Sequence, residues 1–190
     1  WTFIEANTGP YADYSRAMIY ESQRNTMVIF DLDYAYPPND VVWEWDGANW
    51  SSRPTLGPSA GIGNAITYDS DRGVQLYFGD VDLWEWDGSN WSMVWGGQPV
   101  SPAITYDTWR EAILAVNTCC RVQETWAYDG STWDFLTREG PPLRKEPALV
   151  FDEARGVAVL FGGYIDQGDN QIDLNDTWEW DGVSWVERIV

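Results

Sequence analysis

The chain contains no histidine and a single lysine, Lys145, among its 190 residues. The absence of histidine excludes the serine–histidine and cysteine–histidine nucleophile pairs of many hydrolases, together with metal sites built on imidazole. Only 11 basic residues oppose 30 acidic ones, and the formal net charge of −19 would repel nucleic acid and anionic membrane surfaces. No apolar run approaches the length of a membrane span. We therefore expect neither a nucleic-acid partner nor membrane insertion.

The chain has only two cysteines, Cys119 and Cys120, and they are adjacent. Neighbouring cysteines cannot adopt the usual disulfide geometry without strain. A vicinal disulfide that stiffens a turn, two bonds to a neighbouring subunit and two free thiols all stay open. The low lysine content, the acidity and the 14 tryptophans favour an extracellular or cell-surface location.

A tryptophan-rich motif occurs four times in the chain. Its first part alternates with period two, which places two aromatic side chains on one face of a strand. An Asp-Gly pair follows, and this pair favours a hairpin turn because glycine accepts a positive φ. The closing tryptophan begins a second strand. The four copies are Val42–Trp50, Leu83–Trp91, Thr125–Trp133 and Asn175–Trp185.

A second repeated hairpin precedes each copy of this motif. It combines a short apolar strand, an acidic residue, an arginine three residues later and a nearly continuous apolar run, which is typical of a strand buried on both faces. We expect the acid and the arginine to pair across the turn as a solvent-exposed pair, contributing up to about 1 kcal/mol. The four hairpins are Ala17–Asp31, Ala65–Asp80, Ala103–Asn117 and Ala148–Gly163, with the pairs Glu21/Arg24, Asp69/Arg72, Asp107/Arg110 and Asp152/Arg155.

Two hairpins in each repeat predict a four-stranded antiparallel sheet. Repeats of about 40 to 50 residues with four strands each are typical of propeller blades. The chain also resembles the kelch-repeat family, in Phe161-Gly162-Gly163 after a buried strand and in Asn175-Asp176-Thr177-Trp178. This resemblance implies an all-β propeller of four antiparallel blades in one domain, residues 1–190. It also implies a galactose-oxidase-like propeller without the copper site, because the histidine ligands are missing. The expected repeats are approximately 11–55, 59–96, 97–138 and 142–190.

The N-terminal segment, residues 1–6, is a surplus copy of the outer strand. Trp1, Phe3 and Ile4 match the strand that begins at the closing tryptophan of each motif. Three interpretations stay open. The chain can be a segment of a longer propeller, it can close as a four-bladed ring, or it can donate this strand to another subunit.

The fourth repeat carries an insertion at residues 163–176. Asp166, Asp169, Asn170 and Asp173 offer oxygen ligands for Ca²⁺, although their spacing does not match the EF-hand pattern and an acidic loop on an acidic protein is usually just solvated. Loops on a repeated scaffold often bind ligands, and the candidate binding aromatics are Tyr34, Tyr36, Trp109 and Tyr164. Asn49, Asn90 and Asn175 begin N-glycosylation sequons.

The carboxylates of the chain recur with the repeat, which is typical of structural residues, so we expect no enzyme activity and no cofactor. We predict a non-enzymatic extracellular module for structural self-assembly, polymerising by donation of its N-terminal strand. The alternative is a protein- or carbohydrate-binding propeller module of a larger secreted protein. The expected partners are further copies of the chain, neighbouring blades of a longer chain, or a protein or glycan ligand.

Overall fold

The computed structural model describes residues 9–10, 18–31, 41–58, 65–79, 82–94, 103–117, 122–168 and 170–189. These residues form strands and turns, with four four-stranded antiparallel sheets that confirm the predicted blades. The described part of the chain contains no helix that is long and apolar enough to cross a membrane. The cysteines, Asp169, Tyr34, Tyr36 and the N-terminal strand with Trp1, Phe3 and Ile4 lie outside the described residues.

Each blade takes its four strands in the order of a meander. Blade 1 contains β1 (Met18–Glu21), β2 (Thr26–Asp31), β3 (Val41–Trp45) and β4 (Trp50–Pro54). Blade 2 contains β5 (Ala65–Asp69), β6 (Val74–Phe78), β7 (Leu83–Trp86) and β8 (Trp91–Val94). Blade 3 contains β9 (Ala103–Asp107), β10 (Ala112–Asn117), β11 (Glu124–Tyr128) and β12 (Trp133–Thr137). Blade 4 contains β13 (Ala148–Asp152), β14 (Val157–Phe161), β17 (Thr177–Trp180) and β18 (Trp185–Arg188).

The Asp-Gly turns have the chemistry that the sequence predicts. In blade 1 the Asp46 carboxylate accepts hydrogen bonds from the backbone N–H groups of Ala48 and Asn49, at 2.8 and 2.7 Å. Gly47 has a φ of +98°, a value that side chains disfavour. The same arrangement recurs in the other three blades, so this turn fixes the register of the outer hairpin.

The first turn of each blade, between its first and second strands, also pairs as predicted. The Asp69 carboxylate accepts from the Arg72 Nε at 2.6 Å and from the backbone N–H of Arg72 at 3.0 Å. The expectation of a solvent-exposed pair was wrong for the first three blades. The carboxylate side chains of Glu21, Asp69 and Asp107 are buried, because the neighbouring blade covers them.

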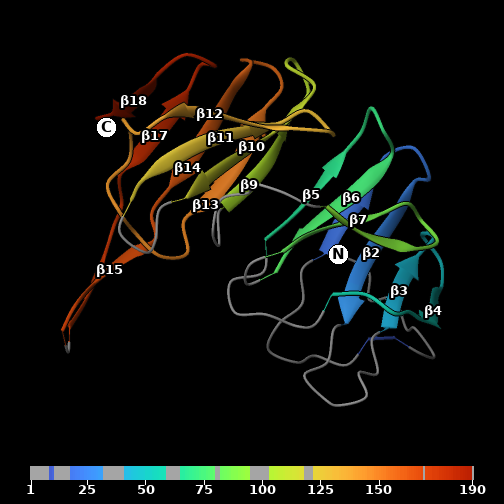
Figure 1. Cartoon of the computed structure of the whole chain (residues 1–190). Helices are drawn as coiled ribbons and strands as arrows, with labels where there is room; N and C mark the ends of the chain where they lie inside the picture. The colour runs from blue at the N-terminus through green and yellow to red at the C-terminus, as the bar shows by residue number, and fades with distance from the viewer. Residues whose placement is uncertain are drawn as a thin grey trace.

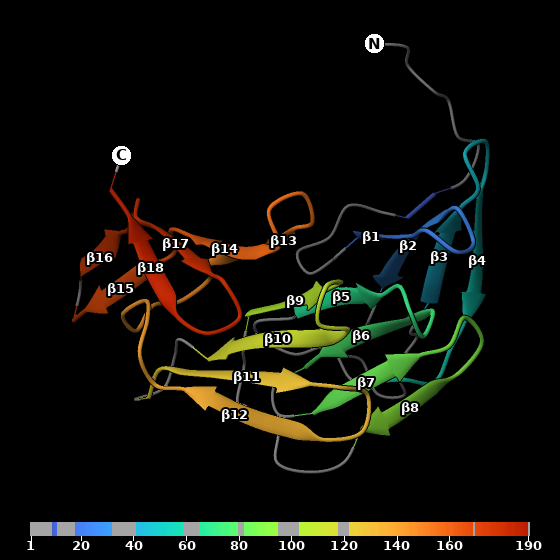
Figure 2. The ribbon, with the colours of Figure 1, turned by 90° about the horizontal axis from the view of Figure 1, so that it is seen from above.

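The four blades are arranged in an open arc, with blades 2 and 3 between blades 1 and 4 (Figures 1 and 2). Contacts between inner strands join β1 to β5, β5 to β9 and β9 to β13, and no comparable contact joins β13 to β1 in the described part of the chain. The described blades therefore form an open arc and not a closed four-bladed ring.

The hydrophobic core consists of three clusters, one at each interface between neighbouring blades. Fully burying a large apolar side chain contributes about 1.5 to 3 kcal/mol, so these interfaces hold the blades together. The clusters contain Val28, Phe30, Val42, Tyr77 and Trp86 between blades 1 and 2; Leu76, Phe78, Leu83, Ile104, Tyr106, Ile113, Ala115 and Tyr128 between blades 2 and 3; and Leu114, Val116, Ala158, Leu160 and Trp180 between blades 3 and 4.

The linkers between blades are held by close contacts at glycine. A Cβ atom added at Gly57 would clash with the indole ring of Trp91, and one at Gly140 would clash with that of Trp185. Each linker thus passes directly against the outer-strand tryptophan of the blade that it enters. The insertion in the fourth repeat is a hairpin rather than a loop, formed by β15 (Tyr164–Gln167) and β16 (Asn170–Asp173), and it projects from blade 4 (Figure 1).

Candidate binding surface

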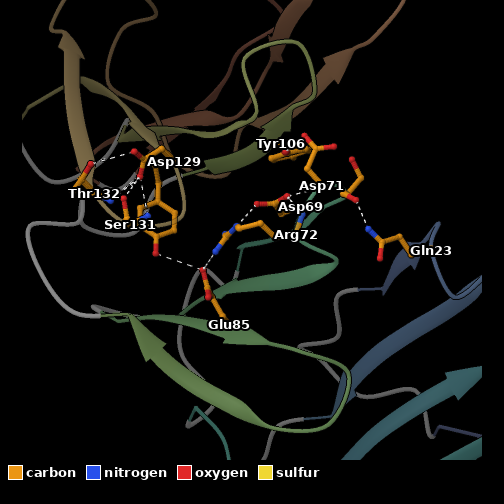
Figure 3. A network of polar contacts seen from close by, with 11 residues as sticks. Gln23, Asp69, Asp71, Arg72, Glu85, Tyr106, Asp129, Ser131 and Thr132 are labelled. Atoms are coloured by element: carbon orange, nitrogen blue, oxygen red, sulfur yellow. Dashed lines mark hydrogen bonds and ion pairs between the residues drawn. The ribbon is translucent and has the colours of Figure 1, made fainter.

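The side faces of the blades form the candidate site, and each interior blade has two of them. We call the side towards the following blade the leading face and the side towards the preceding blade the trailing face. First-turn residues make hydrogen bonds across the interfaces between blades 1 and 2 and between blades 2 and 3. Gln23 Nε2 of blade 1 donates to the Ser70 carbonyl of blade 2 at 2.5 Å. Tyr106 Oη of blade 3 donates to the Asp71 carboxylate of blade 2 at 2.6 Å (Figure 3).

The first-turn arginine makes a second contact across each interface. Arg72 lies between the carboxylates of Asp69 and Glu85 in its own blade, at 2.6 and 2.7 Å. Its guanidinium also reaches the Asp-Gly turn of blade 3, where a Cβ added at Gly130 would lie 2.9 Å from the Arg72 Cζ. The same guanidinium lies over the Tyr128 ring, 5.6 Å from its centroid. Glycine is therefore required at this turn for the arginine as well as for its φ.

The interface between blades 1 and 2 has a second arginine. Arg53, in the outer strand β4, donates to the Gly88 carbonyl and lies over the Trp86 ring, 4.9 Å from its centroid. Both Arg53 and the first-turn Arg24 also bond the Glu44 carboxylate, at 3.1 and 3.0 Å. Two arginines that share one carboxylate thus form the polar part of the leading half of this interface.

Blade 3 departs from this pattern. Ala127 occupies the strand position at which the other blades carry Glu44, Glu85 and Glu179. Arg110 keeps its turn partner Asp107 at 2.6 Å and donates to the backbone carbonyl of Asp181 in blade 4. The contact with the next blade is therefore retained although the strand carboxylate is missing.

Burial and neighbouring charges change the pKa values of several groups in these interfaces. Burial raises the pKa of Tyr128 to about 12, and the nearby Glu85 charge adds to this effect. Burial and the hydrogen bond to Asp71 raise the pKa of Tyr106. Burial alone would lower the pKa of Arg72, but its hydrogen bonds to the Asp69 and Glu85 carboxylates raise it, and the net effect is a raised pKa. At neutral pH these tyrosines stay protonated and act as hydrogen-bond donors.

The two ends of the arc expose faces that the interior blades bury. Val150, on the leading face of blade 4, is 60% exposed, whereas its counterparts Thr67 and Thr105 are 7% exposed. Tyr20, on the trailing face of blade 1, is 47% exposed, whereas its counterpart Tyr106 is 6% exposed. Phe161 adds a second apolar side chain to the face of blade 4, and it is 50% exposed.

The structure places the other predicted site residues apart from one another. The Trp109 ring lies against Gly156 of blade 4 and is 62% exposed. Tyr164 is half-buried in β15, where its backbone pairs with that of Lys145. These two aromatics stay predictions as ligand-binding residues. The sequon residues Asn49, Asn90 and Asn175 are all exposed, and their glycosylation stays a prediction.

The proposed calcium ligands lie in the projecting hairpin β15–β16. Asp166 pairs with the Lys145 ammonium at 2.5 Å, and Asp173 accepts from Gln171 Nε2 at 2.7 Å. Asn170 is exposed at the start of β16. The described residues contain no group of three or more acidic or cysteine side chains that would hold a metal ion. Calcium binding stays a prediction.

No family model matches the chain, and no curated protein matches it in sequence. Several solved structures are similar to it in fold. A chain in the crystal structure of a nidogen–laminin complex matches with a TM-score of 0.56 and 16% identity over 85% of this chain and 60% of that chain. YjhT matches with a TM-score of 0.61 and 9% identity over 92% of this chain and 68% of that one. TolB from Acinetobacter baumannii matches with a TM-score of 0.56 and 11% identity, over 90% and 42% respectively.

These three neighbours are β-propeller proteins, and the chain therefore has a propeller fold. The chain spans about 60% of the matched nidogen–laminin chain and less than half of TolB. Sequence reasoning found the blades but missed the two exposed side faces. These faces could be recognised only once the register of the strands was known, because a side face combines alternate residues of several strands.

Proposed function

We propose that this chain is a non-enzymatic assembly module that binds protein through the open side faces of its first and last blades. The observation that carries this proposal is the exposure of Val150 at a position where the interior blades bury threonine. A face exposed only to water would favour the more polar residue at this position. The end blade instead has the more apolar residue, which favours a partner that covers it.

The extent of the exposed face supports the same conclusion. Phe161 and Val150 lie on the same side of blade 4, and Met18 and Tyr20 share the trailing face of blade 1. Each interior interface joins two faces of this kind through an apolar cluster. The open faces therefore have the chemistry of half-interfaces, and a protein surface is their natural complement.

The solution mass tests this proposal, measured by light scattering across a dilution series. We expect a mass above the 21.7 kDa of one chain that falls on dilution. Val150→Glu should give the single-chain mass, because it places a charge in the covered face. Val183→Glu is the matched control, since Val183 is exposed in the blade 4 turn, away from the face. An equal mass for the two variants would overturn the proposal.

A wild-type chain that stays at the single-chain mass at every concentration would contradict self-assembly. The alternative function would then be the binding of a different protein by the same faces. We also propose, from the kelch-like sequence marks and the composition, an extracellular kelch-type propeller. Donation of the strand with Trp1, Phe3 and Ile4 is a second route to assembly. Deletion of residues 1–6 tests it, and an unchanged mass would exclude that route.

A further inference from the structure

The interface between blades 1 and 2 shows which polar and aromatic groups each blade contributes to an interface. Its leading half contains Arg24 and Arg53, which share the Glu44 carboxylate. Its trailing half contains Trp86 and the Gly88 turn, which receive the Arg53 guanidinium. The two arginines and one carboxylate on one side thus meet an aromatic ring and a glycine turn on the other.

Blade 4 repeats this leading half at its open face. Arg155 Nη1 donates to Glu179 Oε1 at 2.5 Å, and Arg188 Nε donates to Glu179 Oε2 at 2.7 Å. Arg155 holds the first-turn position of Arg24, and Arg188 holds the outer-strand position of Arg53. Both side chains are about half-exposed, since no following blade lies against them within the chain.

Blade 1 repeats the trailing half at its open face. Its sequence from Trp43 to Gly47 is identical to that from Trp84 to Gly88 in blade 2. A Cβ added at Gly47 would meet nothing within 4 Å, whereas one at Gly88 would lie 3.7 Å from the Arg24 guanidinium. The turn at Gly47 therefore has space for an arginine that the described part of its own chain does not supply.

We infer that the leading face of blade 4 docks on the trailing face of blade 1 in a second copy of the chain. In this contact Arg188 donates to the Gly47 carbonyl and lies over the Trp45 ring, and Arg155 lies over Gly47. The inference rests on the proposed function and specifies its partner and orientation. A second copy is the occupant because one chain carries both unmatched halves of the same interface. Such a contact is heterologous, so repeated docking gives a ring if it closes and a filament if it does not.

The net charge of the chain sets the conditions for docking. Two copies that each carry a net charge of −19 repel each other at low ionic strength. The Debye length is about 8 Å at 0.15 M salt, which screens this long-range repulsion but leaves contacts within the interface. Assembly should therefore strengthen when the salt concentration rises from about 0.01 M to about 0.15 M.

A complementation experiment tests the orientation. Val150→Glu blocks every leading face, and Met18→Glu blocks every trailing face, so each variant alone should have the single-chain mass. An equimolar mixture should contain dimers, because the intact leading face of the Met18→Glu copy can dock on the intact trailing face of the Val150→Glu copy. A mixture that stays monomeric, while the wild type assembles, would overturn the head-to-tail arrangement. Met18 and Val150 are both exposed, and circular dichroism checks that each variant folds.

A second experiment tests the arginine contact. Arg188→Ala should weaken assembly at least about tenfold, as expected for the loss of a charged hydrogen bond. Arg138→Ala is the matched control, since Arg138 is an exposed arginine that bonds a carboxylate of its own blade. At the equivalent turn of blade 3 an added Cβ at Gly130 would lie 2.9 Å from the Arg72 Cζ, which is too close. If Arg155 approaches Gly47 in the same way, Gly47→Ala should weaken assembly in the wild type but much less in the Arg155→Ala background, because the close contact needs the guanidinium. Additive effects of these two substitutions would contradict contact between Arg155 and Gly47.

The outcomes separate this inference from the proposed function. If Val150→Glu abolishes assembly but Arg188→Ala matches Arg138→Ala and the mixture stays monomeric, the open face binds protein in another orientation and only the inference fails. If Val150→Glu and Val183→Glu have the same mass, both the inference and the proposed function fail.

Discussion

The strongest single test of the fold concerns the ion pair between Arg144 and Asp176. Arg144 is fully buried in the linker that enters blade 4, and its Nη1 and Nη2 bond the two carboxylate oxygens of Asp176 at 2.5 and 2.7 Å. Arg144 also donates to the carbonyls of Pro142 and Gly162, at 3.0 and 2.9 Å. Trp178 Nε1 donates to Asp176 Oδ2 at 2.7 Å. The pair thus connects the linker, the end of β14 and the start of β17.

We expect Asp176→Ala to lower the free energy of unfolding by about 3 to 5 kcal/mol. The substitution leaves a buried guanidinium without its counter-charge and removes two of its four hydrogen bonds, and the loss of one partner from a buried pair has this magnitude. Urea unfolding followed by tryptophan fluorescence measures it. Asp166→Ala is the control, because Asp166 pairs with Lys145 on the surface of the same blade and should cost at most about 1 kcal/mol.

Equal losses for Asp176→Ala and Asp166→Ala would refute this reasoning. The double variant Arg144→Met with Asp176→Ala provides a second check. It should cost less than the sum of the two single variants by at least about 1 kcal/mol, because each single variant leaves an unpaired charge that the double variant lacks.

Three further predictions concern acid stability, the linker and blade 3. The Arg144 bonds lower the pKa of Asp176 below its ordinary 3.8, and backbone N–H donors lower that of Asp129 to about 2. Because these carboxyl groups have lower pKa values in the folded state than in the unfolded state, they stabilise the folded protein above pH 4. This contribution is lost as the pH falls through the folded pKa values, so the melting temperature should fall between about pH 4 and pH 2. A melting temperature that stays constant over this pH range would contradict the prediction. Gly57→Ala should cost about 1 to 3 kcal/mol through the clash with Trp91, whereas Gly79→Ala, whose added Cβ makes only ordinary contacts, should cost less; equal losses would exclude the clash. Ala127→Glu should stabilise the folded protein by up to about 1 kcal/mol, because it gives Arg110 the strand carboxylate that the other blades have. A lower melting temperature for this variant would contradict that role.

The local hairpins were predictable from the sequence because each is specified within a few residues. The Asp-Gly pair at Asp46 and Gly47 fixes one turn, and the acid–arginine spacing at Asp69 and Arg72 fixes the other. Both pieces of turn chemistry were predicted and confirmed. The hairpin β15–β16 was missed because six of its eight strand residues are exposed and most of them are polar, so neither strand has the alternation of a half-buried sheet.

The contacts between blades were not predictable in the same way. Arg72 has a turn partner three residues away, which the sequence reveals, and an interblade contact with Gly130 that depends on how two blades pack. The burial of Asp69 has the same origin, so its pair with Arg72 was mistaken for a surface pair. The continuous apolar run of the second strand predicted burial on both faces, and this is confirmed for β6 and β10 but not for β14, where Phe161 is exposed.

The difference between interior and terminal blades follows from the way a repeat fold is stabilised. Each blade contributes its own hairpins plus the interfaces with its neighbours, so blades 2 and 3 gain from two interfaces and blades 1 and 4 from one. The end blades should therefore open more readily than the interior blades. Covering the faces of Val150 and Tyr20 by a second copy would supply the missing interface at both ends. Assembly in this fold would then also stabilise the end blades, because each of them would gain a second interface.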